Sequence, residues 1–217
     1  MVYRIYVEKR PGLSPEAGSL LGDLRGFLGL TALKGLRILN RYDVEGVSRE
    51  VWDKARDVVF SEPQVDVTYE ETFPLPGEGW HVLAVESLPG QFDQRADSCA
   101  QCIQLMAGVE RPLVACAKVY LLEGDLGAED LEKLRRYLIN PVESREASLD
   151  KPETLRRTYD VPHTVRTLTG FTALDEAGLA ALLEELGLAM DLDDLRFLQT
   201  YFRDDEGRDP TITEVRV

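Results

Sequence analysis

Hydrophobic and polar residues alternate at the start of the chain. Tyr3, Ile5 and Val7 fall on one face, and Arg4 and Glu8 fall on the other. A period of two predicts a β-strand. Apolar residues then recur at helical spacing, at Leu20, Leu21, Leu24, Phe27 and Leu28. The chain therefore begins as a strand that is followed by a helix.

Capping residues mark where the helices begin. Ser14 precedes Pro15, which suits an N-cap followed by the first helical residue, and Ser48 precedes the next helical pattern. Further strands are predicted at 36–44, 65–69, 80–86 and 113–122, and further helices at 51–59, 96–106 and 131–138. The strand at 36–44 has a polar face, made of Arg37, Arg41 and Asp43.

Sequence landmarks recur 78 positions apart and in the same order. The matched pairs are Pro11-Gly12 with Pro89-Gly90, Glu45-Gly46 with Glu123-Gly124, Pro63 with Pro141, and Glu8 with Glu86. A fixed offset predicts an internal duplication. We therefore expect an α+β fold over residues 1–150, with halves at about 1–76 and 79–150. Each half is expected to be of split βαβ, ferredoxin-like type, and the two are expected to pack together as a symmetric dimer does.

The rest of the chain has a different character. Residues 151–169 are predicted to be a linker or an extended packing segment, because they have little periodicity. Residues 170–217 are predicted to form a short, mostly helical linker domain, with helices lined by Leu179, Leu182, Leu183 and Leu186 and by Leu192, Leu195, Leu198 and Phe202. Asp191 is the expected cap of the second of these helices.

A last helix is predicted to start at Pro210, with Asp209 as its cap. No stop signal follows before Val217. This favours a chain that is cut where another domain starts, and a short terminal helix is the alternative.

The charge of the chain restricts its partners. Lys and Arg total 25 against 39 for Asp and Glu, a formal net charge of −14. Such a chain repels phosphate backbones and anionic lipids, so neither a nucleic-acid nor a membrane partner is predicted. The N-terminus lacks the apolar core of a signal peptide and only three cysteines occur, which favours a cytoplasmic protein.

The residue types that usually carry chemistry are sparse. Cys99 and Cys102 form a lone CxxC, without the second pair that a zinc ribbon needs. Their spacing favours core packing. Neither His81 nor His163 has a recognisable nucleophile partner, and no glycine-rich phosphate loop occurs. We expect no catalytic, cofactor-binding or metal-binding residue in this chain.

The most unusual stretch runs from Leu88 to Ser98. It brings Gln91, Asp93, Arg95 and Asp97 to a helix start. Helix capping and weak surface ion pairs would explain such residues, and a surface that contacts another domain is the alternative.

Several runs of residues resemble one family. They are LPGQFDQRADSCAQCIQ at 88–104, NRYDVEG at 40–46, VFSEP at 59–63 and YLINPVESREAS at 137–148. They resemble phosphoribosylformylglycinamidine synthase in its long single-chain form, and the likeness extends over essentially all 217 residues. That family converts formylglycinamide ribonucleotide, ATP and glutamine to formylglycinamidine ribonucleotide in purine biosynthesis.

The resemblance implies a scaffold role. The chain corresponds to the N-terminal domain, which is like two copies of a small accessory subunit, and to the linker domain of that enzyme. Its partners would be the synthase and glutaminase domains, and ATP and Mg²⁺ would belong to the full-length enzyme. The residues expected at the interface with these domains are Gln91, Asp93, Arg95, Asp97, Asn140, Glu143 and Arg145. The chain could instead be a free-standing accessory subunit that acts in trans, or a regulatory domain that binds a small molecule.

Overall fold

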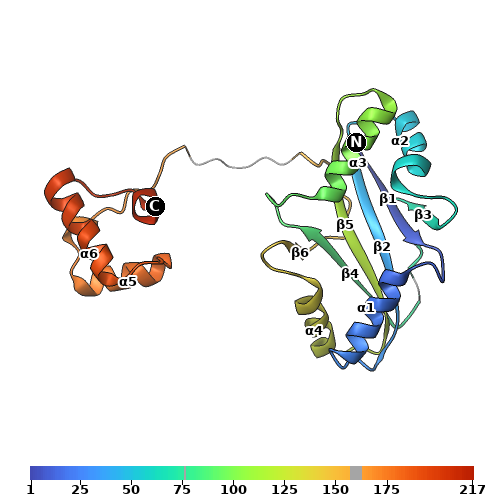
Figure 1. Cartoon of the computed structure of the whole chain (residues 1–217), viewed down its shortest axis with the longest axis horizontal. Coiled ribbons are helices and arrows are strands. Elements are labelled where there is room, and N and C mark those ends of the chain that lie inside the picture. The colour runs from blue at the N-terminus through green and yellow to red at the C-terminus, as the bar shows by residue number, and fades with distance from the viewer. Residues whose placement is uncertain (76, 157–162) are drawn as a thin grey trace. The chain divides into compact units, whose positions relative to one another are not determined.

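The computed structural model describes residues 1–75, 77–156 and 163–217 (Figure 1). The chain divides into two compact units, Met1–Arg157 and Thr158–Val217, which are described separately below. The fold is α+β, as the sequence predicted. Within the described ranges, no helix is both long and apolar enough to cross a bilayer. Residues 157–162 of the predicted linker lie outside the described residues.

The first unit is built on one antiparallel sheet of six strands, in the order β3-β1-β2-β5-β4-β6. The strands are β1 (Val2–Lys9), β2 (Leu33–Glu45), β3 (Asp66–Glu70), β4 (Trp80–Ser87), β5 (Leu113–Gly124) and β6 (Ser144–Glu146). The first five occur where the sequence predicted them. No strand was predicted at β6, because its sequence Ser-Arg-Glu carries no apolar alternation.

Helices cover one face of this sheet. They are α1 (Pro15–Gly26), α2 (Arg49–Ala55), α3 (Gln94–Ala107) and α4 (Ala128–Leu138), and α2 continues into a π-helical turn at Arg56–Phe60. Two of the predicted starts are confirmed: α1 begins at Pro15, and the Ser48 hydroxyl accepts a hydrogen bond from Val51 N at 3.3 Å. Ser14 makes no side-chain cap bond, so proline alone marks the start of α1.

The strand registers repeat at the offset seen in the sequence. Val2 pairs with Glu45 in the first half, and Trp80 pairs with Glu123 in the second. Each residue of the second pair lies 78 positions after its counterpart in the first pair. In the same way, the outer pair Val7–Thr68 of β1 and β3 corresponds to the pair Val85–Glu146 of β4 and β6. The strand order is accordingly symmetric about the central β2–β5 pair.

The helices form two pairs with separate apolar cores. Figure 1 shows α2 and α3 over one end of the sheet and α1 and α4 over the other. The α2–α3 core contains Ile5, Val7, Tyr42, Val44, Trp52, Ala55, Phe60, Ala96, Cys99, Ile103 and Cys116. The α1–α4 core contains Ala17, Leu24, Leu30, Leu33, Leu36, Ile38, Leu83, Tyr120, Leu122, Leu126 and Leu134. Each core takes residues from both halves, so neither half can complete a core alone.

The opposite face of the sheet is also buried. Its apolar cluster, here the far-face core, contains Tyr6, Leu39, Ala84, Ala117, Val119, Leu121 and Ala147. Phe73, which follows β3, packs on it with its ring centroid 4.8 Å from that of Tyr6. Chain segments that follow β3 and β6 therefore cover the face that no helix covers.

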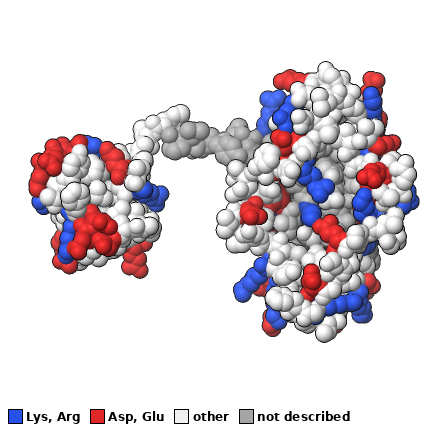
Figure 2. Space-filling view, in the orientation of Figure 1, with Lys and Arg blue, Asp and Glu red and all other residues white. Residues whose placement is uncertain are grey.

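The second unit is a small helical body. It contains α5 (Glu176–Leu186), α6 (Leu192–Tyr201) and α7 (Ile212–Arg216), with short 3₁₀ and π turns at Phe171–Ala173 and Phe202–Glu206. Its core is formed by Leu168, Phe171, Leu179, Leu195 and Val215. The predicted cap Asp191 is confirmed, since its carboxylate accepts a hydrogen bond from Asp194 N at 2.9 Å. On the face shown in Figure 2, acidic groups cover more of its surface than basic groups do.

The cap predicted for the last helix was wrong. Thr211, rather than Asp209, caps α7, and its hydroxyl accepts from Glu214 N at 3.3 Å. The Asp209 carboxylate instead accepts hydrogen bonds from Gly170 N at 2.7 Å and Thr172 N at 3.0 Å. A distant loop competes for this carboxylate, which a local capping pattern does not reveal.

Candidate functional site

The predicted interface residues fall into two groups in the first unit. Gln91 lies in the turn after β4. Asn140 and Glu143 lie in the turn before β6, and Arg145 lies within that strand. These two turns, 88–92 and 140–145, are here called the turn pair. The remaining residues, Asp93, Arg95 and Asp97, lie at the start of α3.

Hydrogen bonds join the two halves of the turn pair. Leu88 N donates to Glu143 O at 2.8 Å, and Gln91 Nε2 donates to Val142 O at 3.1 Å. Asn140 Oδ1 accepts from Val142 N at 3.2 Å, which shapes the second turn. The structure thus brings together residues that are about fifty positions apart in the sequence.

Arg145 extends this group along the sheet edge. Its guanidinium lies 2.7 Å from Glu86 Oε1, across the β4–β6 pair. Both side chains keep contact with solvent, and such a pair contributes little to stability. The turn pair also exposes two large apolar side chains, Phe92 at 75% and Val142 at 72%. Together with Gln91, these side chains form a mixed apolar and polar surface.

The residues at the start of α3 have separate local roles. Asp93 caps the helix, and its Oδ1 accepts from Ala96 N at 3.0 Å. Asp97 forms a 2.5 Å ion pair with Arg111. Arg95 differs, because its Nη1 reaches across to the hydroxyl of Tyr42, at 3.1 Å. Capping and ion pairing therefore explain Asp93 and Asp97, and Arg95 is the member of this group that points toward the sheet.

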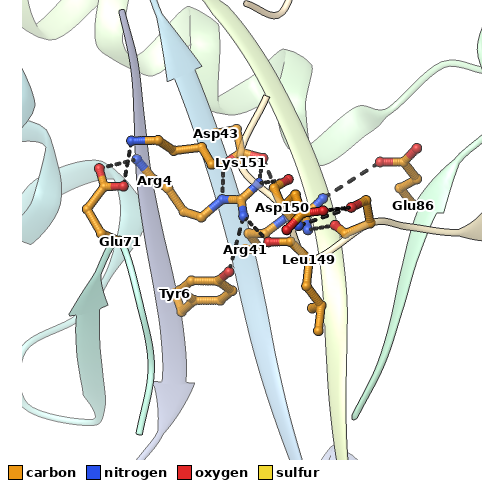
Figure 3. A network of polar contacts seen from close by, with 10 residues as sticks. Arg4, Tyr6, Arg41, Asp43, Glu71, Glu86, Leu149, Asp150 and Lys151 are labelled. Atoms are coloured by element: carbon orange, nitrogen blue, oxygen red, sulfur yellow. Dashed lines mark hydrogen bonds and ion pairs between the residues drawn. The ribbon is translucent and has the colours of Figure 1, made fainter. Parts of the chain in front are cut away.

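A buried charge network on the far face of the sheet was missed by the sequence analysis. Arg4, Arg41 and Asp43 have side chains that are 2%, 5% and 2% exposed (Figure 3). Arg4 holds Asp43 with two hydrogen bonds, from Nε at 2.6 Å and Nη2 at 2.9 Å. Arg41 Nε lies 3.4 Å from Asp43 Oδ2. Asp43 thus faces two buried cations, and Glu86 Oε2 lies 3.7 Å from Arg41 Nη2 as a second, weaker partner.

The network holds the segment that follows β6. Residues 147–156, here called the exit segment, place main-chain carbonyl groups over Arg4 and Arg41 (Figure 3). Arg4 donates to Leu149 O at 2.6 Å and to Asp150 O at 3.3 Å. Arg41 Nη1 donates to Ser148 O at 2.6 Å. With Tyr6 Oη at 3.4 Å, all five N–H groups of Arg4 have an acceptor.

Arg4 keeps its positive charge in this network. Burial opposes the charge of Arg4, but the hydrogen bonds and the charge of Asp43 outweigh it, and the pKa of Arg4 is raised. Further along the exit segment, the Glu45 carboxylate accepts from Leu155 N at 2.6 Å and from the Thr154 hydroxyl at 2.8 Å. These bonds lower the pKa of Glu45. Ionised groups therefore hold the exit segment at both of its ends.

A polar face on a strand gave no signal that this network is buried. Arg37 belongs to the same predicted polar face as Arg41 and Asp43, yet it pairs with Glu8 at a partly exposed position. The burial depends on the exit segment, which lies more than a hundred positions along the chain. Charge alternation alone cannot distinguish a solvated face from a face that a later segment covers.

The cysteines follow the packing prediction only in part. Cys99 and Cys116 are buried in the α2–α3 core, and burial raises the pKa of Cys99 to about 12. Burial also raises the pKa of Cys116. Cys102 is exposed instead, which corrects its predicted place in the core. In the described ranges, no three His, Cys, Asp or Glu side chains are grouped so that they could hold a metal ion.

Two features of this unit stand out. A rigid buried network fixes the exit segment, and the turn pair presents a mixed surface beside it. Comparison with known proteins found no matching family model and no matching curated sequence.

Proposed function

We propose that this chain is the N-terminal scaffold and linker region of a phosphoribosylformylglycinamidine synthase. In this role it organises the synthase and glutaminase domains and does not carry the catalytic residues. The observation that supports the proposal most directly is the repeat of every strand register at an offset of 78, together with the four sequence runs that resemble the family. That enzyme is expected to begin with a duplicated accessory domain.

We further propose that the two halves are tandem split βαβ, ferredoxin-like copies. In the first half, β2 and β3 both run antiparallel to β1, so they are parallel to each other and α2 connects them. In the second half, β5 and β6 flank β4 in the same way and α4 connects them. A duplication followed by close packing accounts for two such units in one sheet.

The turn pair is the surface that we assign to the catalytic domains. It combines the exposed side chains of Phe92 and Val142 with Gln91, Asn140 and Glu143, and it is held in shape by main-chain hydrogen bonds. A rigid surface that mixes apolar anchors with polar groups is typical of a contact between domains. The acidic helical unit supports the same role, because residues 163–217 carry twelve acidic side chains against five arginines.

The alternatives make different demands on the chain. A free-standing accessory subunit would stimulate separately expressed synthase and glutaminase chains when it is added in trans. A scaffold that acts in cis would stimulate the synthase and glutaminase domains only when it belongs to the same polypeptide as they do. Mixing the purified chain with the separate catalytic domains distinguishes these two arrangements.

The main test uses the enzyme that carries this chain, with the double substitution Phe92→Ser and Val142→Ser. Ammonia is supplied either as free ammonium or from glutamine, and formation of formylglycinamidine ribonucleotide is measured. A scaffold defect lowers the glutamine-dependent rate by about tenfold, which corresponds to ~1.4 kcal/mol of lost coupling, and leaves the ammonium-dependent rate unchanged.

The matched control is Leu105→Ser. Leu105 is 77% exposed on α3, outside the turn pair, so its loss is expected to leave both rates unchanged. Equal losses of both rates in the double variant would refute the assignment of the turn pair. Stoichiometric binding of ATP by the purified chain, or release of ammonia from glutamine, would refute the scaffold role itself.

A further inference from the structure

A polar strip divides the apolar face that the helices cover. The α2–α3 core and the α1–α4 core lie on either side of the cross-strand pair Asn40–Lys118, at the centre of the β2–β5 ladder. These two positions are 78 residues apart, so they face each other where the symmetry of the strand order is centred. Helix-covered sheet positions are normally apolar, and this central pair is not.

Asn40 is only partly satisfied at this position. Its Oδ1 atom is buried and accepts no hydrogen bond from any residue in the described part of the chain. Lys118, by contrast, forms an ion pair with Glu16 of α1. A buried acceptor without a donor destabilises a fold, so such a group requires a specific reason in a native structure. A donor from outside the protein is one such reason.

A cleft adjoins the unsatisfied amide. It has a volume of about 400 Å³ and is lined by Lys9, Glu16, Asn40, Tyr42, Asp66 and Arg95, among others. This volume lies within the ~300–1,000 Å³ that small-molecule sites occupy. Figure 2 shows basic and acidic atoms close together in the middle of the first unit, between the places that α3 and α1 occupy in Figure 1. We call the cleft that these residues line the central cleft.

Arg95 and Asn40 both keep hydrogen-bonding capacity in the central cleft. Lys9 is paired with Asp66 at 2.9 Å, and Glu16 is paired with Lys118. Arg95 has a single hydrogen bond, to the Tyr42 hydroxyl at 3.1 Å, and no carboxylate partner among the described residues. The cleft thus offers, among its polar groups, one guanidinium that can bind a carboxylate and one amide oxygen that can accept an N–H.

The spacing of these groups suits a compact ligand. Asn40 and Tyr42 are two positions apart on β2, so their side chains emerge on the same face of the sheet as neighbours. Because Arg95 contacts the Tyr42 hydroxyl, it lies over the same strip. A molecule that carries a carboxylate and an amino group within a few bonds can reach both.

We propose that the central cleft binds a free α-amino acid, with the carboxylate on Arg95 and the ammonium group on Asn40 Oδ1. A nucleotide fits less well, because Glu16, Glu62 and Asp66 also line the cleft and would repel a phosphate chain. This inference does not depend on the proposed function, since it concerns a ligand of the first unit alone and not the assembly of other domains.

The test measures thermal unfolding and calorimetric binding of the whole chain with the common L-amino acids, one at a time at about 10 mM. A ligand at about tenfold its Kd raises the midpoint of a domain of this size by ~3–5 °C. At least one amino acid is expected to produce a saturable shift, while acetate and methylamine, which each carry one of its two groups, produce none.

Substitutions then locate the site. Arg95→Met removes the carboxylate partner and is expected to weaken binding at least tenfold. Asn40→Val removes the unsatisfied acceptor, so it is expected to abolish the ligand-induced shift without lowering the midpoint of the free chain. Arg111→Met is the matched control, because Arg111 pairs with Asp97 outside the cleft and its loss is expected to leave binding unchanged.

Three results would overturn the proposal. They are the absence of a saturable shift with any amino acid, an undiminished shift in both cleft variants, and an equal loss in the Arg111 control. A shift produced by AMP or ATP alone, and lost in Arg95→Met, would assign the cleft to a nucleotide and overturn it as well. The scaffold proposal is unaffected by each of these results, because its test measures product formation in the assembled enzyme.

Discussion

The buried charge network gives the sharpest test of how the first unit is held together. Asp43→Asn keeps the shape of the side chain and removes the charge that Arg4 and Arg41 share, while Glu86 still lies 3.7 Å from Arg41. Two buried guanidinium groups are then left without their shared counterion. Breaking a buried ion pair in this way typically costs about 3–5 kcal/mol.

The second half of the sheet supplies the matched control. The positions 78 residues after Arg4, Arg41 and Asp43 are Val82, Val119 and Leu121, and Val82 pairs with Leu121 as Arg4 pairs with Asp43. The triple variant Arg4→Val, Arg41→Val, Asp43→Leu therefore replaces the network by side chains that the same backbone register already accommodates. Replacing a whole buried ion network by apolar groups is often nearly neutral, and we expect the triple variant to be more stable than Asp43→Asn.

Urea unfolding followed by tryptophan fluorescence is the appropriate assay. Both tryptophans, Trp52 and Trp80, lie in the first unit, so the signal reports that unit and not the helical one. With a slope of ~2 kcal/mol per molar urea, Asp43→Asn is expected to lower the midpoint by about 2 M. A triple variant that is less stable than Asp43→Asn, or an Asp43→Asn midpoint within about 0.3 M of the parent chain, would refute the reasoning.

Two further predictions concern thiols and carboxyl groups. In the native chain a thiol reagent is expected to modify Cys102 at once. It is expected to reach Cys99 and Cys116 only on unfolding, because both are buried. Rapid modification of all three thiols in the folded chain would contradict the place of Cys99 and Cys116 in the core. In the second unit, hydrogen bonds from Arg208 lower the pKa of Glu214 to about 2, so the stability that this carboxylate contributes is present above its ordinary pKa of 4.5 and is lost as the pH falls toward 2. Arg208→Met is expected to raise the Glu214 pKa toward 4.5 in a carboxyl NMR titration, and an unchanged pKa would exclude Arg208 as the cause.

The strands and most helix starts could be predicted from local sequence because their signals are local. Alternation located β1 and β2, and the proline after Ser14 located the start of α1. The offset of 78 was visible because turn residues must recur where a backbone path recurs. Such features depend on φ, ψ and side-chain direction within a few residues.

Contacts over long sequence distances account for what local patterns did not show. The three-residue strand β6 has no apolar alternation, and its pairing with β4 depends on a turn that is bound to Leu88. Asp209 was expected to cap its own helix and instead binds the backbone at Gly170 and Thr172. Arg95 was identified as unusual, but its contact with Tyr42 across the core requires the assembled sheet.

The difference between the two halves is informative about the exit segment. One backbone register carries Arg4 and Asp43 in the first half and Val82 and Leu121 in the second, so the sheet itself does not require the charges. What differs is the covering chain: Arg4 donates to main-chain carbonyl groups of the exit segment, at Leu149 and Asp150. Those carbonyl groups lie outside the strand ladders and accept hydrogen bonds from the guanidinium groups instead. The guanidinium groups supply donors at the point where the chain leaves the first unit, and this explains why buried charge is retained in one half only. On the proposed scaffold role, Asp43→Asn is expected to lower the glutamine-dependent rate of the assembled enzyme more than the ammonium-dependent rate. The apolar triple variant is expected to do the same, although it is expected to be more stable than Asp43→Asn.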